Sequence, residues 1–363
     1  MITKLNISGF KGFERLELPA LSRVTLLGGR NNAGKTSILE AISMFFERLN
    51  PQFIFVQFSW RGIEIVPLEP EAIWGPLFLN YDMNKEITIS AVINDTEEKM
   101  TIRFNPDYID PVISAEASTT GTSAKYLQIK TDQKTTSSHA LNITFDTKER
   151  KNQEFHLLIG PEGIIPRGQR DLANVKVWTI FVGSREEPKL SLDAERFGRL
   201  DIVGKQNKIV DFLKIIEPNL KSLSSIASGN TSIIHGDIGI GRKIPVIYMG
   251  DGVSRLLTII LSIATSQGGI VLLDEFENGI HYSVMPKVWE AIGRAAREFD
   301  CQVIGTTHSY ECLEAAYKGF SVSEELQKDF SYIRIDKKGT KTVANTFDYE
   351  TLGVAIASNM EVR

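Results

Sequence analysis

The sequence has few cysteines, no long hydrophobic run and no apolar leader at its N-terminus. Its 363 residues include two cysteines, Cys301 and Cys312, too few for a disulfide framework. The longest apolar stretch, residues 256–264, is far shorter than the roughly 20 residues that span a bilayer. Neither a secreted disulfide scaffold nor a membrane-spanning protein fits these features. We therefore expect a soluble cytoplasmic protein without a membrane partner.

The chain also lacks a strong excess of charge. It carries 41 basic and 45 acidic side chains, a formal net charge of −4, with 42% hydrophobic and 24% charged residues. These values exclude disordered and collagen-like chains, and any nucleic-acid surface would have to be a local patch. Two short basic clusters are candidates for one, Lys148-Glu149-Arg150-Lys151 and Lys205-Gln206-Asn207-Lys208. Because such runs usually lie on solvated faces, DNA binding stays open.

Hydrophobic periodicity predicts strands and one long helix in the first two thirds of the chain. The helix opens at Thr36 and is ended by Pro51, with Glu40, Glu47 and Arg48 outside its apolar face. The Ser- and Thr-rich stretch 114–138 reads as a loop, and residues 190–223 have a helical pattern. Strands are expected at 4–10, 13–18, 23–27, 86–93, 99–104, 126–129, 141–145 and 175–182, with short strands within 231–247.

The last third alternates strands with helices. Helices are expected at 253–264 and 284–299, strands at 270–273 and 302–305, and then one further helix before strands at 330–336 and 342–347. This alternation predicts an α/β protein with a mostly parallel sheet and helices on both faces. Residues 1–95 and 268–363 are expected to form one lobe, and residues 96–267 an inserted lobe of strands and helices. No sustained heptad predicts a coiled coil.

The strongest motif is a phosphate-binding loop, GxxxxGK[ST]. It follows an apolar strand and precedes the amphipathic helix, which is the required context. Glycines permit a tight loop whose backbone N–H groups face phosphates, Lys35 places a charge on the β- and γ-phosphates, and the Thr36 hydroxyl takes a Mg²⁺ position. The expected nucleotide-binding residues are Gly29, Arg30, Asn31, Asn32, Ala33, Gly34, Lys35, Thr36 and Ser37.

Three further segments complete the pattern of a P-loop NTPase. The apolar strand 270–273 is followed directly by Asp274, an expected metal ligand, and by Glu275, which would polarise the attacking water. His308 follows strand 302–305, where ligand sites of open α/β sheets collect, and is expected to sense the γ-phosphate. The glycines of Tyr248-Met249-Gly250-Asp251-Gly252-Val253-Ser254 directly precede a helix, another anion-binding start.

These four segments, in this order, resemble the ABC-type ATPase heads of the SMC, RecF and OLD group, and in particular its stand-alone AAA family ATP-binding proteins, which often act in anti-phage defence. The resemblance covers residues 1–50 and 190–363. It is supported by four further segments, Ile7-Ser8-Gly9-Phe10-Lys11-Gly12-Phe13, Asp193-Ala194-Glu195-Arg196-Phe197, Glu277-Asn278-Gly279-Ile280-His281 and Met360-Glu361-Val362-Arg363.

The resemblance implies a head-to-tail dimer that sandwiches two ATP molecules with Mg²⁺. In each site, Lys35, Glu275 and His308 would be catalytic and Thr36 and Asp274 would hold the metal. The signature residues Gly250, Asp251, Gly252 and Ser254 would reach the other subunit's nucleotide. The family often has Ser at the position of Gly250, so the strength of activation across the dimer stays open. Gln57 is the candidate for the family's Q-loop glutamine.

Several functions remain open at this stage. The first is an ATP-driven dimeric switch for a partner effector or a DNA transaction, including RecF-like repair. The second is an ATP-dependent scaffold for a separately encoded, Toprim-like nuclease, because no acidic DxD cluster of a fused nuclease follows His308. A transporter subunit fits poorly, since the segment between Gly34 and Gly250 is too long. A GTPase fits poorly as well, because the pairs Asn84-Lys85 and Asn207-Lys208 lack an Asp two residues on.

Overall fold

The computed structural model describes the chain except residues 49, 51–52, 64, 111–112, 118–126, 132–135, 161–162, 169–176, 178, 184–189, 230, 340, 359 and 362–363. The strands are β1 Ile2–Phe10, β2 Phe13–Leu18, β3 Val24–Gly28, β4 Ile87–Ile93, β5 Thr96–Asp110, β6 Ile113–Ala117, β7 Leu127–Thr131, β8 Thr136–Asp146, β9 Gln153–Gly160, β10 Gly163–Gly168, β11 Thr179–Val182, β12 Ser222–Ser228, β13 Thr231–Asp237, β14 Ile244–Pro245, β15 Ile270–Leu273, β16 Gln302–Thr306, β17 Phe330–Lys338 and β18 Lys341–Asp348.

The helices lie mainly in the C-terminal half. The α-helices are α1 Lys35–Phe46, α2 Phe53–Trp60, α3 Pro70–Ile73, α4 Leu190–Ile202, α5 Gln206–Leu213, α6 Asp251–Ala264, α7 Met285–Glu298, α8 Tyr310–Phe320, α9 Glu324–Lys328 and α10 Tyr349–Ala357. Short 3₁₀ turns are η1 Gly75–Leu77, η2 Leu79–Tyr81 and η3 Val246–Met249. Among the described residues, no helix combines the length and the apolar character needed to cross a bilayer.

A six-stranded sheet forms the centre of the molecule, in the order β11-β15-β16-β3-β17-β18. The first five strands run parallel, and β18 is antiparallel to β17. Alternate residues of β15 face two different cores: Ile270 and Leu272 face one, and Val271 and Leu273 the other. Strands buried on both faces are continuously apolar, which is why these strands are recognisable in the sequence.

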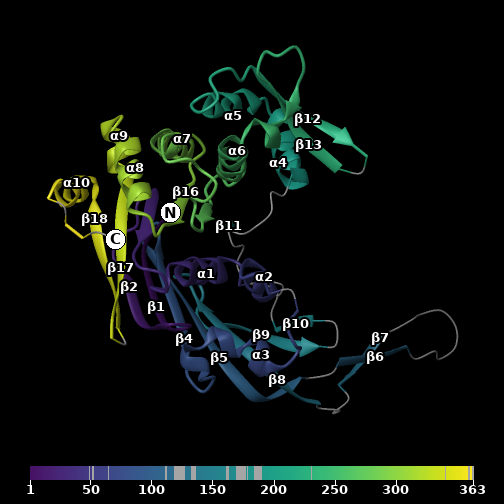
Figure 1. Ribbon diagram of the computed structural model, residues 1–363. Coiled ribbons are helices and arrows are strands. Elements are labelled where there is room, and N and C mark those ends of the chain that lie inside the picture. The colour runs from purple at the N-terminus through teal and green to yellow at the C-terminus, as the bar shows by residue number, and fades with distance from the viewer. Residues whose placement is uncertain are drawn as a thin grey trace.

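The two cores have different coverings (Figure 1). Helices α6, α7 and α8 pack on one face of the parallel sheet, and α4 and α5 continue this core toward the three-stranded sheet β12-β13-β14. On the other face, α1 lies between the parallel sheet and a seven-stranded antiparallel sheet in the order β10-β9-β8-β5-β4-β1-β2. The chain is therefore a mixed α/β protein, as the sequence predicts.

The antiparallel sheet crosses the expected boundary at residue 95. Strand β4 pairs with β5 from Ile87 opposite Ile102 to Ile93 opposite Thr96, and β1 pairs with β4. The first strands of the chain thus share one sheet with strands of the expected insert. The division into 1–95 with 268–363 and 96–267 stays a prediction.

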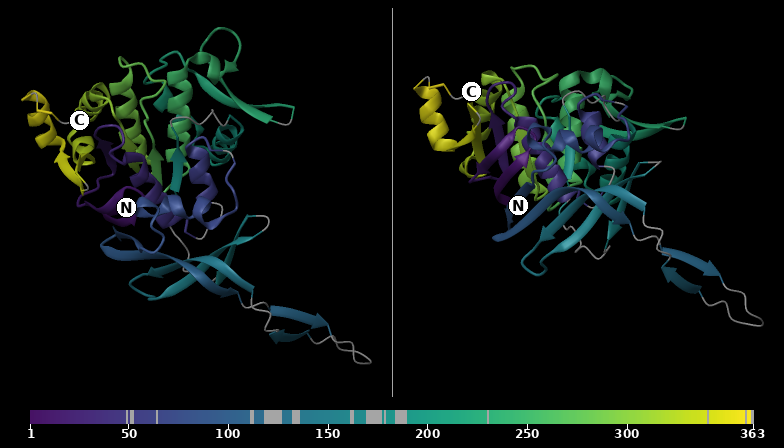
Figure 2. Two further views of the ribbon diagram at one scale, coloured as in Figure 1. Left: turned by 60° about the horizontal axis from the view of Figure 1, so that its bottom comes forward. Right: turned by 90° about the horizontal axis from the view of Figure 1, so that it is seen from below.

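The prediction of a loop over residues 114–138 is wrong at 114–117, 130–131 and 136–138, which lie in strands, whereas the strand expected at 126–129 overlaps β7; residues 118–126 and 132–135 lie outside the described residues. Strands β6 and β7 pair antiparallel from Ile113 opposite Thr131 to Ala117 opposite Leu127, and β8 begins at Thr136. In both views of Figure 2 these two strands stand out from the end of the seven-stranded sheet.

Other expected elements match in kind and differ in extent. Helix α1 ends at Phe46, before Pro51, which lies outside the described residues together with residues 175–176 and 178 of an expected strand. The helical pattern over 190–223 contains α4 and α5, with β12 starting at Ser222. Among the described residues after His308 there are three helices, α8, α9 and α10, where one was expected. Strands β9 and β10 and helix α2 were not expected from the sequence.

Candidate nucleotide and metal site

The phosphate-binding loop joins β3 to α1 and is closely fitted to its surroundings. Gly29 and Gly34 have φ of 132° and 96°, values that favour glycine. A Cβ on Gly29 would lie 2.3 Å from the Ile335 carbonyl oxygen, and one on Gly34 would lie 2.5 Å from the Phe13 ring. The N-cap Gly34 offers no side-chain cap and the first turn of α1 has no acidic residue, so its N–H groups remain available to an anion.

Lys35 lies beneath this loop. Its Nζ donates to the carbonyl oxygens of Gly29, at 2.7 Å, and Arg30, at 3.0 Å. Burial lowers the pKa of Lys35, and the nearby Glu275, Asp274 and Glu277 carboxylates act in the opposite direction. The ammonium is therefore held at the place where the loop would wrap a phosphate chain.

Thr36 and Asp274 meet at the carboxyl ends of the parallel strands. The Thr36 hydroxyl donates to the two carboxylate oxygens of Asp274 at 2.9 and 3.2 Å. The hydroxyl of Thr306, at the end of β16, also donates to Asp274, at 2.7 Å. Burial raises the pKa of Asp274, and these two hydroxyl donors partly offset it. Sequence reasoning gave no role to Thr306, although it stands two residues before His308.

His308 lies beside Glu275. Its Nδ1 is 3.8 Å from Glu275 Oε1 and 3.6 Å from Glu277 Oε1. The backbone N–H of Glu275 donates to Thr306 Oγ1 at 2.8 Å, and Glu275 has a φ of 41°. The structure thus brings the predicted base and the predicted sensing histidine together, and adds Glu277, which the sequence analysis quoted only as part of a motif.

The expected signature residues open α6 on the other core. Gly250 has φ 110° and ψ 149°, a conformation open essentially to glycine alone, which explains why Ser does not stand here. A Cβ on Gly279, in the loop after Glu277, would lie 3.9 Å from the Asp251 Cβ, so this turn adjoins the loop after β15. Helix α4 fixes α6 from the side, because Thr258 Oγ1 donates to Asp193 at 2.6 Å and Arg196 donates to Ser262 at 2.9 Å.

A cavity of about 510 Å³ adjoins the phosphate-binding loop at Ser37. Its lining includes Lys11, Gln57 and Arg61. Gln57 lies on α2, and its Oε1 accepts from Lys11 Nζ at 3.1 Å. The assignment of Gln57 to the Q-loop stays a prediction.

The donors present fit a magnesium–nucleotide complex. The Thr36 hydroxyl and the Asp274 carboxylate are hard oxygen donors, the type that Mg²⁺ prefers, and Mg²⁺ usually takes one or two carboxylates together with substrate phosphates. The open N-terminus of α1 and the loop without Cβ atoms at Gly29 and Gly34 form a cradle for the phosphates themselves.

Most of the chain matches a known protein family. Residues 24–314 match the family described as "AAA domain, putative AbiEii toxin, Type IV TA system". A Helicobacter pylori protein named ATP/GTP phosphatase is 22% identical over 336 residues, covering 86% of this chain and 87% of that protein. A shorter match, 34% identical over 67 residues, links 17% of the chain to 31% of the uncharacterized protein MJECL10 of Methanocaldococcus jannaschii.

The fold is also shared with a solved structure. The crystal structure of an SMC head bound to the C-winged helix domain of ScpA has a TM-score of 0.51 and 13% identity, and the match covers 96% of this chain and 97% of that one. Its likeness supports the fold assignment, and the family match spans the phosphate-binding loop, the signature turn and His308. The chain therefore belongs to this AAA-domain family and is an ATPase of the AAA/ABC type with the fold of an SMC head.

Proposed function

We propose that this ATPase works as a head-to-tail dimer that closes on two Mg·ATP and switches a separately encoded effector. The observation that carries the proposal is the convergence of Thr36, Asp274, Glu275 and His308 at one edge of the parallel sheet. Lys35 and Mg²⁺ would stabilise phosphate charge, and Glu275 would orient the attacking water. The relative named ATP/GTP phosphatase supports triphosphate hydrolysis.

The position of the signature turn at the start of a helix supports the proposed dimer. Gly250 opens α6 without a side-chain cap, which leaves backbone N–H groups at the helix start, although the Asp251 carboxylate stands in the same first turn. In the proposed dimer this start meets the nucleotide held by the partner's phosphate-binding loop. The solved SMC head bound to a ScpA domain supports a separate protein as the effector. The family description, which names a toxin–antitoxin system, supports a role in bacterial defence.

A second candidate is an ATP-dependent scaffold with little turnover. Gly250 lacks the hydroxyl that the signature often places against the γ-phosphate, and its φ of 110° keeps the position closed to Ser. Binding and dimerisation would then persist with slow hydrolysis. Steady ATP turnover by the isolated chain separates this candidate from the switch.

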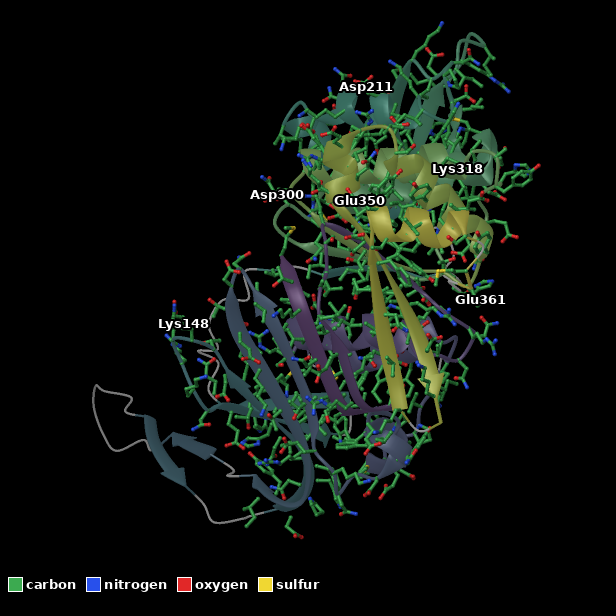
Figure 3. The ribbon with its side chains drawn as sticks, turned by 90° about the vertical axis from the view of Figure 1, so that its left-hand side faces the viewer. Lys148, Asp211, Asp300, Lys318, Glu350 and Glu361 are labelled. Carbon is green, nitrogen blue, oxygen red and sulfur yellow. The ribbon has the colours of Figure 1, made fainter. Side chains whose placement is uncertain are left out.

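A DNA transaction has weaker support. Figure 3 shows Lys148, in the turn between β8 and β9, well apart from Asp211, on α5. The two basic clusters lie on these separate elements, residues 148–151 between β8 and β9 and residues 205–208 at the start of α5. Lys208 also pairs with Glu298. A salt-dependent titration with duplex DNA tests whether either cluster binds phosphates.

The test of the switch is Glu275→Gln. We expect this variant to bind ATP, to lose at least about 100-fold in kcat because a positioned base is removed, and to accumulate as a closed dimer. ATP hydrolysis and sedimentation velocity with Mg·ATP measure the two effects. The matched control is Glu290→Gln, whose carboxylate pairs with Arg294 on α7 and should leave both unchanged. A Glu275→Gln enzyme with the original rate would refute the base assignment.

A further inference from the structure

The turn after β15 and the turn after β16 are linked by one carboxylate outside the predicted site. Glu277 Oε1 accepts a hydrogen bond from Thr307 Oγ1 at 2.7 Å and another from the His308 backbone N–H at 3.3 Å. Thr307 is itself fixed to the nucleotide-binding strand, because its N–H donates to the Leu27 carbonyl at 2.9 Å. Glu277 thus connects the two turns that carry Glu275 and His308.

The Glu277 side chain is much less exposed to solvent than the neighbouring side chains of His308 and Glu275. The Glu277 side chain is 9% exposed, against 42% for His308 and 37% for Glu275. Its second oxygen, Oε2, is buried and has no hydrogen-bond partner among the described residues. Burying a carboxylate with one unpaired oxygen costs free energy of folding, so this side chain is not placed as an ordinary solvated surface residue would be. Its two described hydrogen-bond donors are the Thr307 hydroxyl and the His308 backbone N–H, which indicates that the buried carboxylate serves to hold these two residues.

The geometry points to Glu277 as a positioning residue for ATP hydrolysis. We propose that it holds the 307–308 turn against the turn after β15, so that the His308 imidazole stays 3.8 Å from Glu275. The inference rests on the proposed function, since it concerns the alignment of the residues that act on the γ-phosphate. Glu277 makes no contact with phosphate in this account. Its effect therefore falls on kcat, because small misplacements of reacting groups slow chemistry strongly.

The first experiment compares Glu277→Ala with Glu277→Gln in ATP hydrolysis. We expect Glu277→Ala to lower kcat by about 10-fold or more while KM for ATP stays within about twofold, since alignment rather than binding is lost. Glu277→Gln keeps an acceptor oxygen for both donors and should recover kcat to within about threefold. The matched control is Glu311→Ala on the neighbouring α8, whose carboxylate accepts from Ser309 and which should retain the original kcat. Equal kcat for Glu277→Ala and the control would overturn the inference.

A double-mutant cycle then tests the link to His308. In a His308→Ala background, Glu277→Ala should have almost no further effect on kcat, because its role is to position that side chain. Full additivity of the two losses would overturn the inference while leaving the ATPase assignment intact; an inactive wild-type chain would instead refute the proposed function. If Glu277→Ala does not fold, Thr307→Val removes the 2.7 Å bond and must lower kcat at constant KM. An unchanged kcat in that variant would also overturn the inference.

Discussion

At the scale of single residues, three charged side chains form a cluster beside the nucleotide site: Lys11, Glu40 and Arg61. Glu40, in the second turn of α1, is fully buried. Its carboxylate forms an ion pair with Lys11 Nζ at 2.6 Å and accepts two hydrogen bonds from the Arg61 guanidinium, each of 2.8 Å. Burial acts to raise the pKa of Glu40, but the two cations outweigh it and hold that pKa below its usual range. The cluster therefore ties the β1–β2 turn and α2 to the helix that carries Lys35.

The buried ammonium group of Lys11 leads us to expect that the stability of the fold depends on pH. Burial lowers its pKa from 10.5 to about 8, so between these values the unfolded chain binds more protons than the folded chain at this residue. The free energy of unfolding should therefore rise with pH over this range, by at most about 1.4 kcal/mol per unit from this group. Urea unfolding from pH 7.5 to 10 should show the contribution as the difference between wild type and Lys11→Met. Lys318→Met, at an exposed lysine, should keep the wild-type slope, and identical slopes for all three proteins would contradict the prediction.

The sequence shows the charged residues in and just after α1 but not their burial. The helical pattern predicts that Glu40, Glu47 and Arg48 lie off the apolar face, which favours solvent, yet Glu40 and Arg48 are buried and Glu47 is half-buried. The reason is long-range: Glu40 is covered by Lys11 and Arg61, and the Arg48 guanidinium lies 3.5 Å from the centre of the Phe145 ring. Local periodicity carries no information about such distant partners. Lys35, Thr36 and Asp274, by contrast, belong to motifs whose spacing is itself the signal.

At the scale of elements, α7 and α8 approach each other closely at one glycine. A Cβ on Gly319 of α8 would lie 2.5 Å from the Pro286 carbonyl oxygen and 2.7 Å from the Trp289 Cβ. Backbone and a buried tryptophan cannot yield easily in a closely packed core. This contact fixes α8, and α8 begins directly after His308 and Ser309, whose hydroxyl caps the helix.

Two glycine substitutions should therefore act in opposite directions. Gly319→Ala should lower the free energy of unfolding by about 1–3 kcal/mol, since the added methyl overpacks the α7–α8 contact. Gly198→Ala, in α4, meets nothing within 4 Å and should raise it by about 0.5–1 kcal/mol through helix propensity. Urea unfolding midpoints measure both. A shift of the same sign for the two variants would show that the contact at Gly319 is looser than described.

The elements that the sequence predicts best are those buried on both faces. Strand β15 reads as four apolar residues followed by Asp274, and the strand in the structure has the same bounds, Ile270–Leu273. Strand β10 is harder, because at the edge of the antiparallel sheet its last three residues, Pro166, Arg167 and Gly168, are exposed. An edge strand that is partly solvated has no strong hydrophobic pattern to reveal it.

At the scale of the whole molecule, the site joins the two cores. Lys35 and Thr36 begin α1, whose buried face belongs to the core beneath the antiparallel sheet, whereas Phe276, next to Glu275, belongs to the core under α6, α7 and α8. A ligand that contacts both sides links them thermodynamically. The free energy of unfolding of the whole chain should therefore increase when the nucleotide binds. It should also depend on the metal ion that Thr36 and Asp274 are arranged to hold.

Mg·ATP should consequently stabilise the entire fold. At a concentration 100 times its Kd, a ligand that binds only the folded state adds about 2.7 kcal/mol, which we expect to raise Tm by about 3–5 °C. Thermal unfolding of Glu275→Gln, in which hydrolysis is suppressed, measures the shift. Chelation of Mg²⁺ should remove most of it, because the Asp274 carboxylate then faces the phosphates without a cation between them. Lys35→Ala should show no shift with or without the metal; if it rose in Tm as much as the parent, the nucleotide would bind elsewhere than at the α1 N-terminus.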